Sequence, residues 1–288
     1  MQKNNRIKHQ ENTKKAHTAA KSKNSNKKQD MTKQSVRLNK AIALSGYCSR
    51  RAADALIFDG KVSINGIKIT DPSMRVSPND CIAIDGKILL KNDKKIYLML
   101  NKPIHSVSTV YDPEGRTTVL DFLPEEYKEF RLYPVGRLDY FSEGLLLLTN
   151  DGDLAYALMH PKFHLPKVYH VRIRGFVPKE KLMKMQEGMT LPDGQKLMPI
   201  KVHASPLSDD ATLLTMTLHQ GVNREIRKVC DALKLTILQL VRVAEGSLTL
   251  GDLPTGHVRE IRPHEVAALY QAARGYPPTA KKTQRPAL

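Results

Sequence analysis

Residues 145–149 form a continuous apolar run, LLLLT, between Gly144 and the turn sequence Asn150-Asp151-Gly152. A short apolar run with turn residues at both ends is typical of a central strand that is buried on both faces. Further strand-like segments lie at residues 96–101, 167–175, 211–221 and 237–253. Strands interrupted by few helices predict an α+β fold with a mixed, mainly antiparallel sheet rather than a doubly wound one.

Three short helices are expected among these strands. The sequence RTTVLDFLP, residues 116–124, predicts a loop and a short helix. Asp153 is a candidate N-cap for a helix that runs to Met159. The segment NREIRKVCDALKL, residues 223–235, predicts an amphipathic helix. The apolar positions on its inward face are Ile226, Val229, Cys230 and Leu233.

The segment 36–91 has a different pattern, with two helices followed by short strands. Apolar residues at helical spacing run from Leu38 to Leu44, and Ser49 is a good N-cap for a second helix. The pairs Asn65-Gly66 and Asp85-Gly86 lie between strand-like residues, which predicts two hairpin turns. This pattern predicts a small helix-plus-sheet domain, followed by a larger domain at residues 95–268.

Most of the positive charge lies near the two ends of the chain. The chain has 46 Lys and Arg against 29 Asp and Glu, a net charge of +17. Ten Lys or Arg and two acids give residues 1–35 a charge of +8, and four Arg or Lys give residues 271–288 a charge of +4. Few large apolar side chains occur there, so we expect a disordered basic tail at 1–35 and a flexible one at 271–288. The tails fit solubilising extensions and phosphate-binding segments equally well.

The composition favours a soluble intracellular protein with a polyanionic partner. No stretch of about 18 apolar residues predicts a transmembrane helix, and the basic N-terminus lacks the apolar core of a secretory signal. The three cysteines lie far apart, which is typical of a reducing cytosol and argues against a Cys-based zinc site. We therefore expect a cytoplasmic protein with no membrane partner.

Basic residues of the first domain gather around its helix starts and first strand. Helix N-termini attract phosphate, and guanidinium groups add paired hydrogen bonds to it. An ordinary solvated face would have the same composition, so residue types alone leave both readings open. The candidates for RNA contact are Arg37, Lys40, Arg50, Arg51 and Lys61.

The sequence RLNKAIALSGYCSRRAADALIFDGKVSINGIKI, residues 37–69, resembles the S-four RNA-binding domain. This resemblance implies a module that binds structured RNA and has no catalytic role. It favours phosphate binding over the plain solvated face for the basic residues of this domain.

Asp139 lies in a polar loop, GRLD, between two apolar strands. On residue type alone, a loop aspartate is more often a cap or turn residue than a catalytic group. However, GRLDYFSEGLLLLTNDGDLA, residues 136–155, resembles the catalytic motif of the pseudouridine synthases. KVYHVRIRG and GVNREIRKVCDAL resemble the next two motifs of that family in the same order. The resemblance extends over about residues 36–268, and is to the branch that modifies ribosomal RNA and carries an N-terminal S-four domain.

The resemblance implies a catalytic set of Asp139, Tyr169 and Arg227. Asp139 would attack or support the ribose or remove one of its protons, and the sequence leaves these three roles open. Arg227 would form a buried ion pair with Asp139, because a nearby guanidinium favours an ionised carboxylate. The alternative is that Arg224, Arg227 and Lys228 form one basic helical face that contacts phosphate. Tyr169 would stack on the target uracil, and Ile226 would form the floor beneath it. A plain core position remains the alternative for both of these side chains.

The same resemblance implies further contacts with substrate. Arg137 would fill the gap that a flipped nucleotide leaves in the RNA stack. RNA contacts are also implied for Lys167, Arg224 and Lys228. The family commonly has threonine three residues after the aspartate, where this chain has Ser142, so the hydroxyl is kept. Tyr140 and Phe141 occupy positions that vary in the family, and they are candidates for substrate choice.

The implied reaction is an isomerisation of uridine, which needs no redox partner and no imported bond energy, so no cofactor is expected. The spacing of His160, His164 and His170 does not predict a metal site. The motifs are most similar to those of the large-subunit enzymes, which implies large-subunit ribosomal RNA as the partner of a monomeric enzyme. The alternative is a catalytically inactive RNA-binding assembly factor on the same fold.

Overall fold

The computed structural model describes residues 35–90, 94–160 and 165–272. The chain divides into two units, Met1–Asp93 and Lys94–Leu288. The domain limits 36–91 and 95–268 stay predictions, and most of the two expected tails lies outside the described residues. Helix α8 (Pro263–Ala272) includes the first two residues of the expected C-terminal tail.

The first unit has two helices and a small sheet. Helices α2 (Leu38–Leu44) and α3 (Arg50–Phe58) pack together. The Ser49 hydroxyl caps α3 by accepting a hydrogen bond from the Ala52 amide at 3.0 Å, as predicted. Asn65-Gly66 and Asp85-Gly86 have positive φ values, which is what tight hairpin turns require.

The strands of this unit are short. They are β1 (Val36–Arg37), β2 (Val62–Ile64), β3 (Ile67–Ile69), β4 (Arg75–Val76), β5 (Ile82–Ile84) and β6 (Lys87–Ile88). Four of them form a sheet in the order β3-β2-β5-β6, and β1 pairs with β4. The apolar faces of the helices and strands meet in one core that includes Leu38, Ile42, Ile57, Val62 and Ile84.

In the described part of the second unit, nine strands form one sheet, with β13-β14-β10-β15-β9-β7-β17 as its main path. The strands on this path are β7 (Tyr97–Lys102), β9 (Glu143–Thr149), β10 (Lys167–Arg174), β13 (Lys201–Ser208), β14 (Ala211–Leu218), β15 (Ile237–Glu245) and β17 (Val258–Glu260). The pairings are antiparallel except that of β9 with β15. The predicted α+β fold with a mixed, mainly antiparallel sheet is confirmed, and residues 145–149 lie in its interior.

The remaining elements cover or extend this sheet. Strand β8 (Tyr133–Val135) pairs with β9, and β16 (Leu248–Thr249) pairs with β15. A separate hairpin joins β11 (Met189–Thr190) to β12 (Lys196–Leu197). The helices are α4 (Glu125–Lys128), α5 (Gly152–Met159), α6 (Lys179–Glu187), α7 (Glu225–Ala232) and α8.

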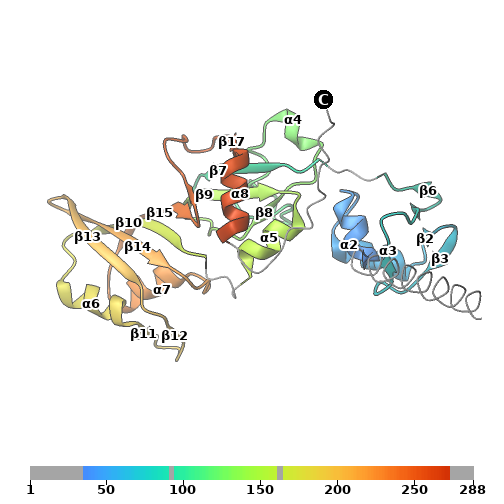
Figure 1. Ribbon diagram of the computed structural model, residues 1–288. Helices are drawn as coiled ribbons and strands as arrows, with labels where there is room; N and C mark the ends of the chain where they lie inside the picture. The colour runs from blue at the N-terminus through green and yellow to red at the C-terminus, as the bar shows by residue number, and fades with distance from the viewer. Residues whose placement is uncertain (1–34, 91–93, 161–164, 273–288) are drawn as a thin grey trace, which may run out of the picture. The chain divides into compact units, whose positions relative to one another are not determined.

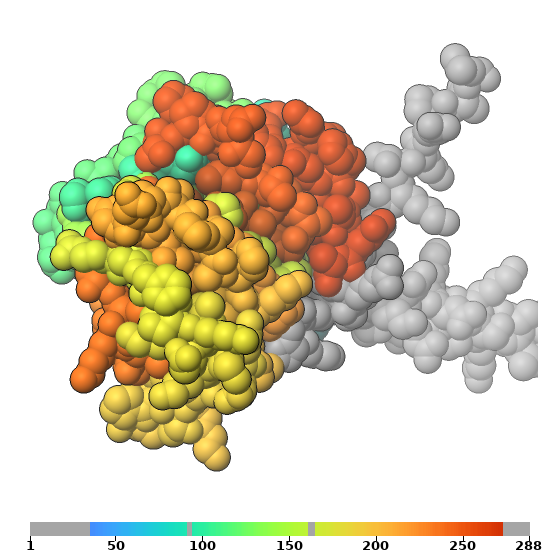
Figure 2. Space-filling model, turned by 90° about the vertical axis from the view of Figure 1, so that its left-hand side faces the viewer, coloured from blue at the N-terminus to red at the C-terminus, as the bar shows by residue number. Residues whose placement is uncertain are grey.

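These elements form two halves that share the sheet (Figure 1). Helices α6 and α7 accompany β10, β13 and β14, whereas α5 and α8 accompany β8 and β9. The first half faces the viewer as the yellow and orange surface of Figure 2. One apolar cluster packs the first half and two pack the second, and Tyr169 of β10 contacts both the first half's cluster and one of the second's. The seam between β9 and β15 therefore joins two halves that also share packing.

Two of the helix predictions are wrong in detail. The N-cap of α5 is Asp151 rather than Asp153, because the Asp151 carboxylate accepts hydrogen bonds from the amides of residues 153 and 154. Residues 116–124 contain turns, and the short helix α4 begins only after Pro124. Proline disfavours a helical backbone at the residue before it and lacks an amide hydrogen, so Pro124 is the N-cap of α4 and the helix begins after it.

Candidate active site

Asp139 begins a tight turn just before strand β9. The Ser142 amide donates a hydrogen bond to the Asp139 carbonyl at 3.0 Å, so Tyr140 and Phe141 are the central residues of the turn. We call residues 139–142 the Asp139 turn. The loop before it is fixed by the Ser108 hydroxyl, which bonds the amide and the carbonyl of Leu138 at 3.1 and 2.9 Å. The Asp139 turn is therefore held firmly at its entry.

A buried lysine that the sequence analysis missed holds the turn from within. The Lys102 ammonium, at the end of β7, is fully buried. It donates hydrogen bonds to the carbonyls of Pro103, Asp139 and Ser142 at 2.9, 3.2 and 3.0 Å. Burial lowers the pKa of Lys102 to about 8, against the opposing influence of the Asp139 and Glu143 charges. Three carbonyl acceptors compensate part of the desolvation penalty of this cation.

Arg227 holds the turn from outside, from helix α7. Its Nη2 donates to the Phe141 carbonyl at 2.8 Å and to the Ser142 hydroxyl at 3.1 Å. Its Nε lies 3.5 Å from Asp139 Oδ2. The predicted ion pair is present, but it is only partly buried, since the Asp139 side chain is 31% exposed and that of Arg227 17%. The carboxylate thus keeps an open side toward the cleft, which a buried pair would lack.

Gly144 explains how the two halves of the unit approach each other at this point. It has a φ of +103°, and a Cβ atom there would lie 2.2 Å from the Arg242 carbonyl oxygen. The backbones of β9 and β15 pair at this position, Gly144 opposite Arg242. A side chain at residue 144 would separate the strands, so this glycine allows the Asp139 turn to lie beside β15 and α7.

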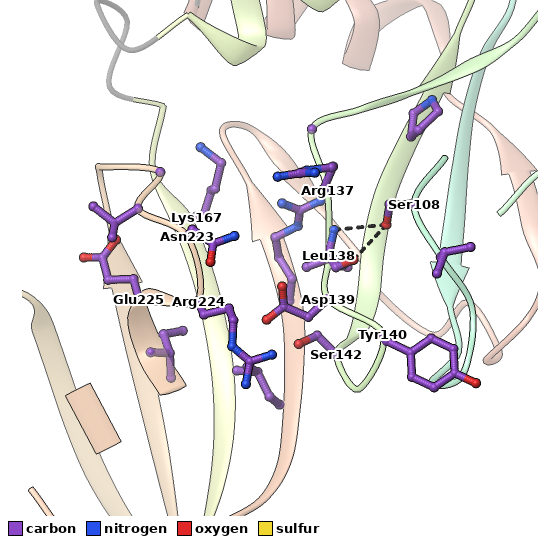
Figure 3. Close-up of a pocket in the computed structure, with 18 of the residues that line it drawn as sticks. Ser108, Arg137, Leu138, Asp139, Tyr140, Ser142, Lys167, Asn223, Arg224 and Glu225 are labelled. Atoms are coloured by element: carbon purple, nitrogen blue, oxygen red, sulfur yellow. Dashed lines mark hydrogen bonds between the residues drawn. The ribbon is translucent and has the colours of Figure 1, made fainter. Parts of the chain in front are cut away.

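A cleft of about 940 Å³ opens at this seam. The predicted catalytic residues Asp139, Tyr169 and Arg227 all line it. Figure 3 shows the Asp139 carboxylate directed into the space between its own loop and the segment that carries Asn223 and Arg224, whereas Tyr140 projects from the other side of the turn. Arg137, Lys167, Arg224 and Ile226 also line the cleft.

Tyr169 lies on β10 and packs against two of the apolar cores, and burial raises the pKa of its hydroxyl. The sequence analysis missed its neighbours Arg242 and Glu245, which are both almost fully buried. Arg242 Nε donates to the Leu145 carbonyl at 2.7 Å, and its Nη2 lies 3.4 Å from Glu245 Oε2. Both residues lie in the strand sequence LVRVAE, residues 240–245. Charged residues between apolar ones in a strand are the one sequence signal that could have identified them.

Lys167 is directed inward rather than toward bulk solvent. Its ammonium lies 3.8 Å from Glu245 Oε1 and donates to the Leu165 carbonyl at 3.3 Å, and burial lowers its pKa. Glu225, at the start of α7, is buried beside the cleft, and burial raises its pKa. Its Oε1 accepts a hydrogen bond from Gln220, whereas its Oε2 has no hydrogen-bond partner among the described residues.

The other predicted residues of the α7 segment occupy three different settings. Ile226 is 4% exposed and belongs to the apolar core, and it also lines the cleft, where its role beneath the base stays a prediction. Arg224 lies just before α7 in the left-handed region, with a φ of +53°. Lys228 is bound within the protein, 2.8 Å from Gln195 and 3.5 Å from Asp193.

The predicted RNA-binding residues of the first unit are mostly exposed. Arg50 and Arg51 form the first turn of α3, and no acidic residue accompanies them there. Cations at a helix N-terminus oppose the helix dipole, so this placement favours an anionic partner. Arg37 precedes α2, Lys40 lies within it, and Lys61 pairs with Asp59 at 3.3 Å.

The described residues contain neither a candidate metal site nor a helix that could span a membrane. Within them, no group of three or more His, Cys, Asp or Glu side chains could hold a metal ion, and His164 lies outside them. None of the helices in these same ranges has the length and apolarity needed to cross a bilayer.

Comparison with known proteins identifies the family. Residues 96–232 match the RNA pseudouridylate synthase family, and residues 36–82 match the S4 domain. Two relatives that are 39% and 37% identical cover 81% and 82% of the chain. The chain therefore belongs to the RNA pseudouridylate synthases, and the predicted resemblance to this family is confirmed.

The first of these relatives is ribosomal large subunit pseudouridine synthase B of Bacillus subtilis (strain 168), aligned over 235 residues and 95% of its own length. The second is an uncharacterized RNA pseudouridine synthase of Aquifex aeolicus, aligned over 94% of its length. A crystal structure of a pseudouridylate synthase is 28% identical, with a TM-score of 0.58, and the match covers 81% of this chain and 99% of that one. The predicted similarity to the large-subunit enzymes agrees with the first relative.

Proposed function

We propose that this enzyme isomerises a specific uridine of large-subunit ribosomal RNA to pseudouridine. The observation that carries the proposal is the Asp139 carboxylate, held at the mouth of the cleft with one side open and the Arg227 guanidinium 3.5 Å away. A cleft of about 940 Å³ has room for an extruded nucleotide, since small-ligand pockets commonly measure ~300–1,000 Å³. The named target of the Bacillus subtilis relative supports the choice of large-subunit RNA.

The reaction breaks the bond between uracil N1 and the ribose C1′ and forms a bond between C5 and C1′. The C5 proton leaves, and N1 gains a proton, so atoms and electrons balance without a cofactor. Asp139 acts at the ribose as nucleophile, as electrostatic support or as proton acceptor, and these roles share one requirement. The carboxylate must be fixed in position, and the contacts of Arg227 and Lys102 with the turn favour this.

Six further residues have proposed roles beside Asp139. Tyr169 stacks on the uracil, and Ile226 supports the base from α7. Extruding a nucleotide costs a few kcal/mol, and Arg137 on the cleft rim is proposed to occupy the vacated place in the RNA. Lys167, Arg224 and Lys228 are proposed to contact the RNA backbone, with Lys228 first leaving Asp193 and Gln195.

RNA is also proposed to bind the first unit, through Arg37, Lys40, Arg50, Arg51 and Lys61. The S4 match and the two arginines at the start of α3 support this assignment. Every proposed catalytic group comes from one chain, which supports a monomer as the active form. We further propose that the enzyme works in the cytoplasm, where its RNA substrate is accessible.

Tritium release from C5-labelled uridine tests the proposal. Full-length large-subunit and small-subunit ribosomal RNA transcripts are incubated separately with the wild-type chain and with Asp139→Asn. We expect release from the large-subunit transcript by the wild type and none by Asp139→Asn. Asp252→Asn, an exposed acid of the same unit outside the cleft, serves as the matched control and retains activity.

The alternative function, an inactive RNA-binding assembly factor, predicts a different outcome. RNA affinity depends mainly on phosphate contacts, so Asp139→Asn should bind the transcript nearly as well as the wild type. Tight binding by the wild type without any tritium release would favour the assembly factor. Normal turnover by Asp139→Asn would instead show that the carboxylate is not the catalytic group.

A further inference from the structure

Three aromatic rings form a cluster on the outer side of the Asp139 turn. The ring centres of Tyr140 and Phe141 are 5.1 Å apart, and that of His105 lies 5.4 Å from Tyr140 and 5.6 Å from Phe141. We call these three residues the aromatic cluster. Tyr140 also lines the cleft, so the cluster lies at the rim of the proposed catalytic site.

Two rings of the aromatic cluster, those of His105 and Phe141, are exposed, and Tyr140 is half-buried. The Phe141 side chain is 58% exposed, and Tyr111, a further cleft-lining residue, is 75% exposed. Contiguous exposed apolar surface is uncommon in proteins and usually marks a place where something binds. The packing of the protein itself gives no reason for these rings to face solvent.

His105 contributes to the cluster from a conformation that few residues adopt. Its φ is +61°, in the left-handed region that favours glycine, and its amide donates to the Tyr140 carbonyl at 2.7 Å. A side chain in that region costs of order 1 kcal/mol or more, and such positions are frequent at functional sites. Glycine would suit the backbone of residue 105 better, so the imidazole ring itself is the feature to be explained.

We propose that the aromatic cluster is a stacking platform for an unpaired RNA base next to the target uridine. This inference rests on the proposed function, and it assigns to His105, Tyr140 and Phe141 the recognition of a neighbouring nucleotide. The base would lie against the exposed ring surface while the uridine occupies the cleft beside Asp139. The platform therefore selects RNA in which the neighbour of the target is free to leave its own stack.

Position and charge favour an RNA base over other occupants. Phe141 is two residues from Asp139, within about 7.6 Å along the backbone, and successive stacked bases are about 3.4 Å apart. A nucleotide one or two steps from the uridine would thus reach the cluster. Arg116, which pairs with Asp112 and Glu114, lines the cleft together with Tyr140, and Arg137 is exposed on the same rim. Cations beside aromatic rings are typical of surfaces that bind single-stranded nucleic acid.

The rings are presented rigidly, which suits them for stacking. Lys102 holds both ends of the Asp139 turn, and Arg227 holds the Phe141 carbonyl. A stacking surface that is already ordered loses little conformational entropy when the base binds. The same contacts that fix the carboxylate therefore fix the aromatic cluster, so the position of the neighbouring base is coupled to that of the uridine.

The test compares Phe141→Ala and His105→Gly with the wild type. The substrate is the shortest stem–loop fragment of the large-subunit transcript that still releases tritium, made with a normal or an abasic nucleotide at each position flanking the uridine. Stacking on an aromatic side chain contributes ~1–3 kcal/mol per base, so each variant should lower kcat/KM by about five-fold to 150-fold on the normal RNA. At one flanking position the abasic RNA should remove this difference, because no base is left to stack.

Two controls separate stacking from damage to the fold. Phe176→Ala removes an exposed phenylalanine that lies outside the cleft, and it should behave as the wild type on every RNA. His105→Gly relieves the left-handed backbone strain, so its melting temperature should be no lower than that of the wild type. Losses in both cluster variants that are equal on normal and abasic RNA at every position would overturn the platform.

A binding measurement keeps this inference separate from the proposed function. An oligouridine strand that carries one 2-aminopurine loses fluorescence when that base stacks on an aromatic ring. Quenching by the wild type that Phe141→Ala abolishes supports the platform, even if no ribosomal transcript releases tritium and the proposed function fails. Turnover by the wild type with quenching that is unchanged in Phe141→Ala retains the function and refutes the platform.

Discussion

Replacing Lys102 by methionine removes the buried ammonium while keeping a long apolar side chain in its place. Three carbonyls, those of Pro103, Asp139 and Ser142, then lose their charged donor. Each such bond contributes ~1.5 kcal/mol at the low end of its range. This loss is partly offset, because the variant no longer buries a charged group. Burial lowers the pKa of Lys102 from 10.5 to about 8, which corresponds to a destabilisation of the folded wild type by about 3 kcal/mol. We expect Lys102→Met to lower the free energy of unfolding by only about 1–2 kcal/mol.

The effect of Lys102→Met on catalysis should be far larger than its effect on stability. The ammonium joins both ends of the Asp139 turn, and its loss lets the turn relax. A shift of about 1 Å in a catalytic group commonly reduces the rate by ~100-fold. We therefore expect kcat, measured by tritium release at saturating RNA, to fall by about 100-fold in a protein that urea denaturation shows to be folded. Lys179→Met, an exposed lysine at the start of α6, is the matched control.

The pH dependence gives this reasoning its sharpest test, because activity and stability should change in opposite directions. Activity should fall as the pH rises through about 8, where Lys102 loses the charge that holds the turn. Its pKa is lower in the folded state than the usual 10.5, so between pH 8 and 10.5 the unfolded state binds more protons. The stability of the wild type relative to Lys102→Met should therefore rise over that range. A folded Lys102→Met with kcat within two-fold of the wild type would refute the assignment.

Two other contacts make further predictions. Arg227→Lys keeps a cation near Asp139 but cannot also bond the turn as Arg227 does, so kcat should fall by at least ten-fold. Because the pair is only partly buried, the free energy of unfolding measured in urea should fall by about 2 kcal/mol rather than by the ~3–5 kcal/mol of a buried pair. Hydrogen bonding to Arg259 lowers the pKa of Glu265 from 4.5 to about 2, so this carboxylate stabilises the fold at neutral pH, by about 3 kcal/mol at most. The stability difference between the wild type and Glu265→Gln should shrink as the pH falls below 4.5, and a difference that stays constant down to pH 3.5 would exclude this role.

Local chemistry explains which parts of the fold were predictable. The hairpins at Asn65-Gly66 and Asp85-Gly86 and the cap of α3 depend on residues that are neighbours in the chain. By contrast, the parallel pairing of β9 with β15 joins Glu143 to Val241, and nothing near either residue indicates it. The N-cap of α5 was misplaced by two residues because Asp151 and Asp153 are both good caps, and only the tertiary position of the backbone decides between them.

The candidate site divides in the same way. Asp139, Tyr169 and Arg227 belong to motifs, and the structure brings all three to one cleft. The sequence did not indicate a buried site residue at Lys102, because a lysine before a proline at the end of a strand is usually solvated. Its signal was present in the sequence as a charge at the end of an apolar strand, YLMLNK, but its three carbonyl acceptors come from segments about forty residues apart.

The arrangement of the two cations links the site to the assembly of the fold. Lys102 reaches the Asp139 turn from β7, in one half of the second unit, and Arg227 reaches it from α7, in the other. The turn has its full set of contacts only when the halves meet along β9 and β15, and Gly144 allows that approach. A carboxylate placed at the seam is therefore positioned by both halves at once. Any change that loosens the seam, even far from the cleft, should reduce turnover before it unfolds the apolar cores.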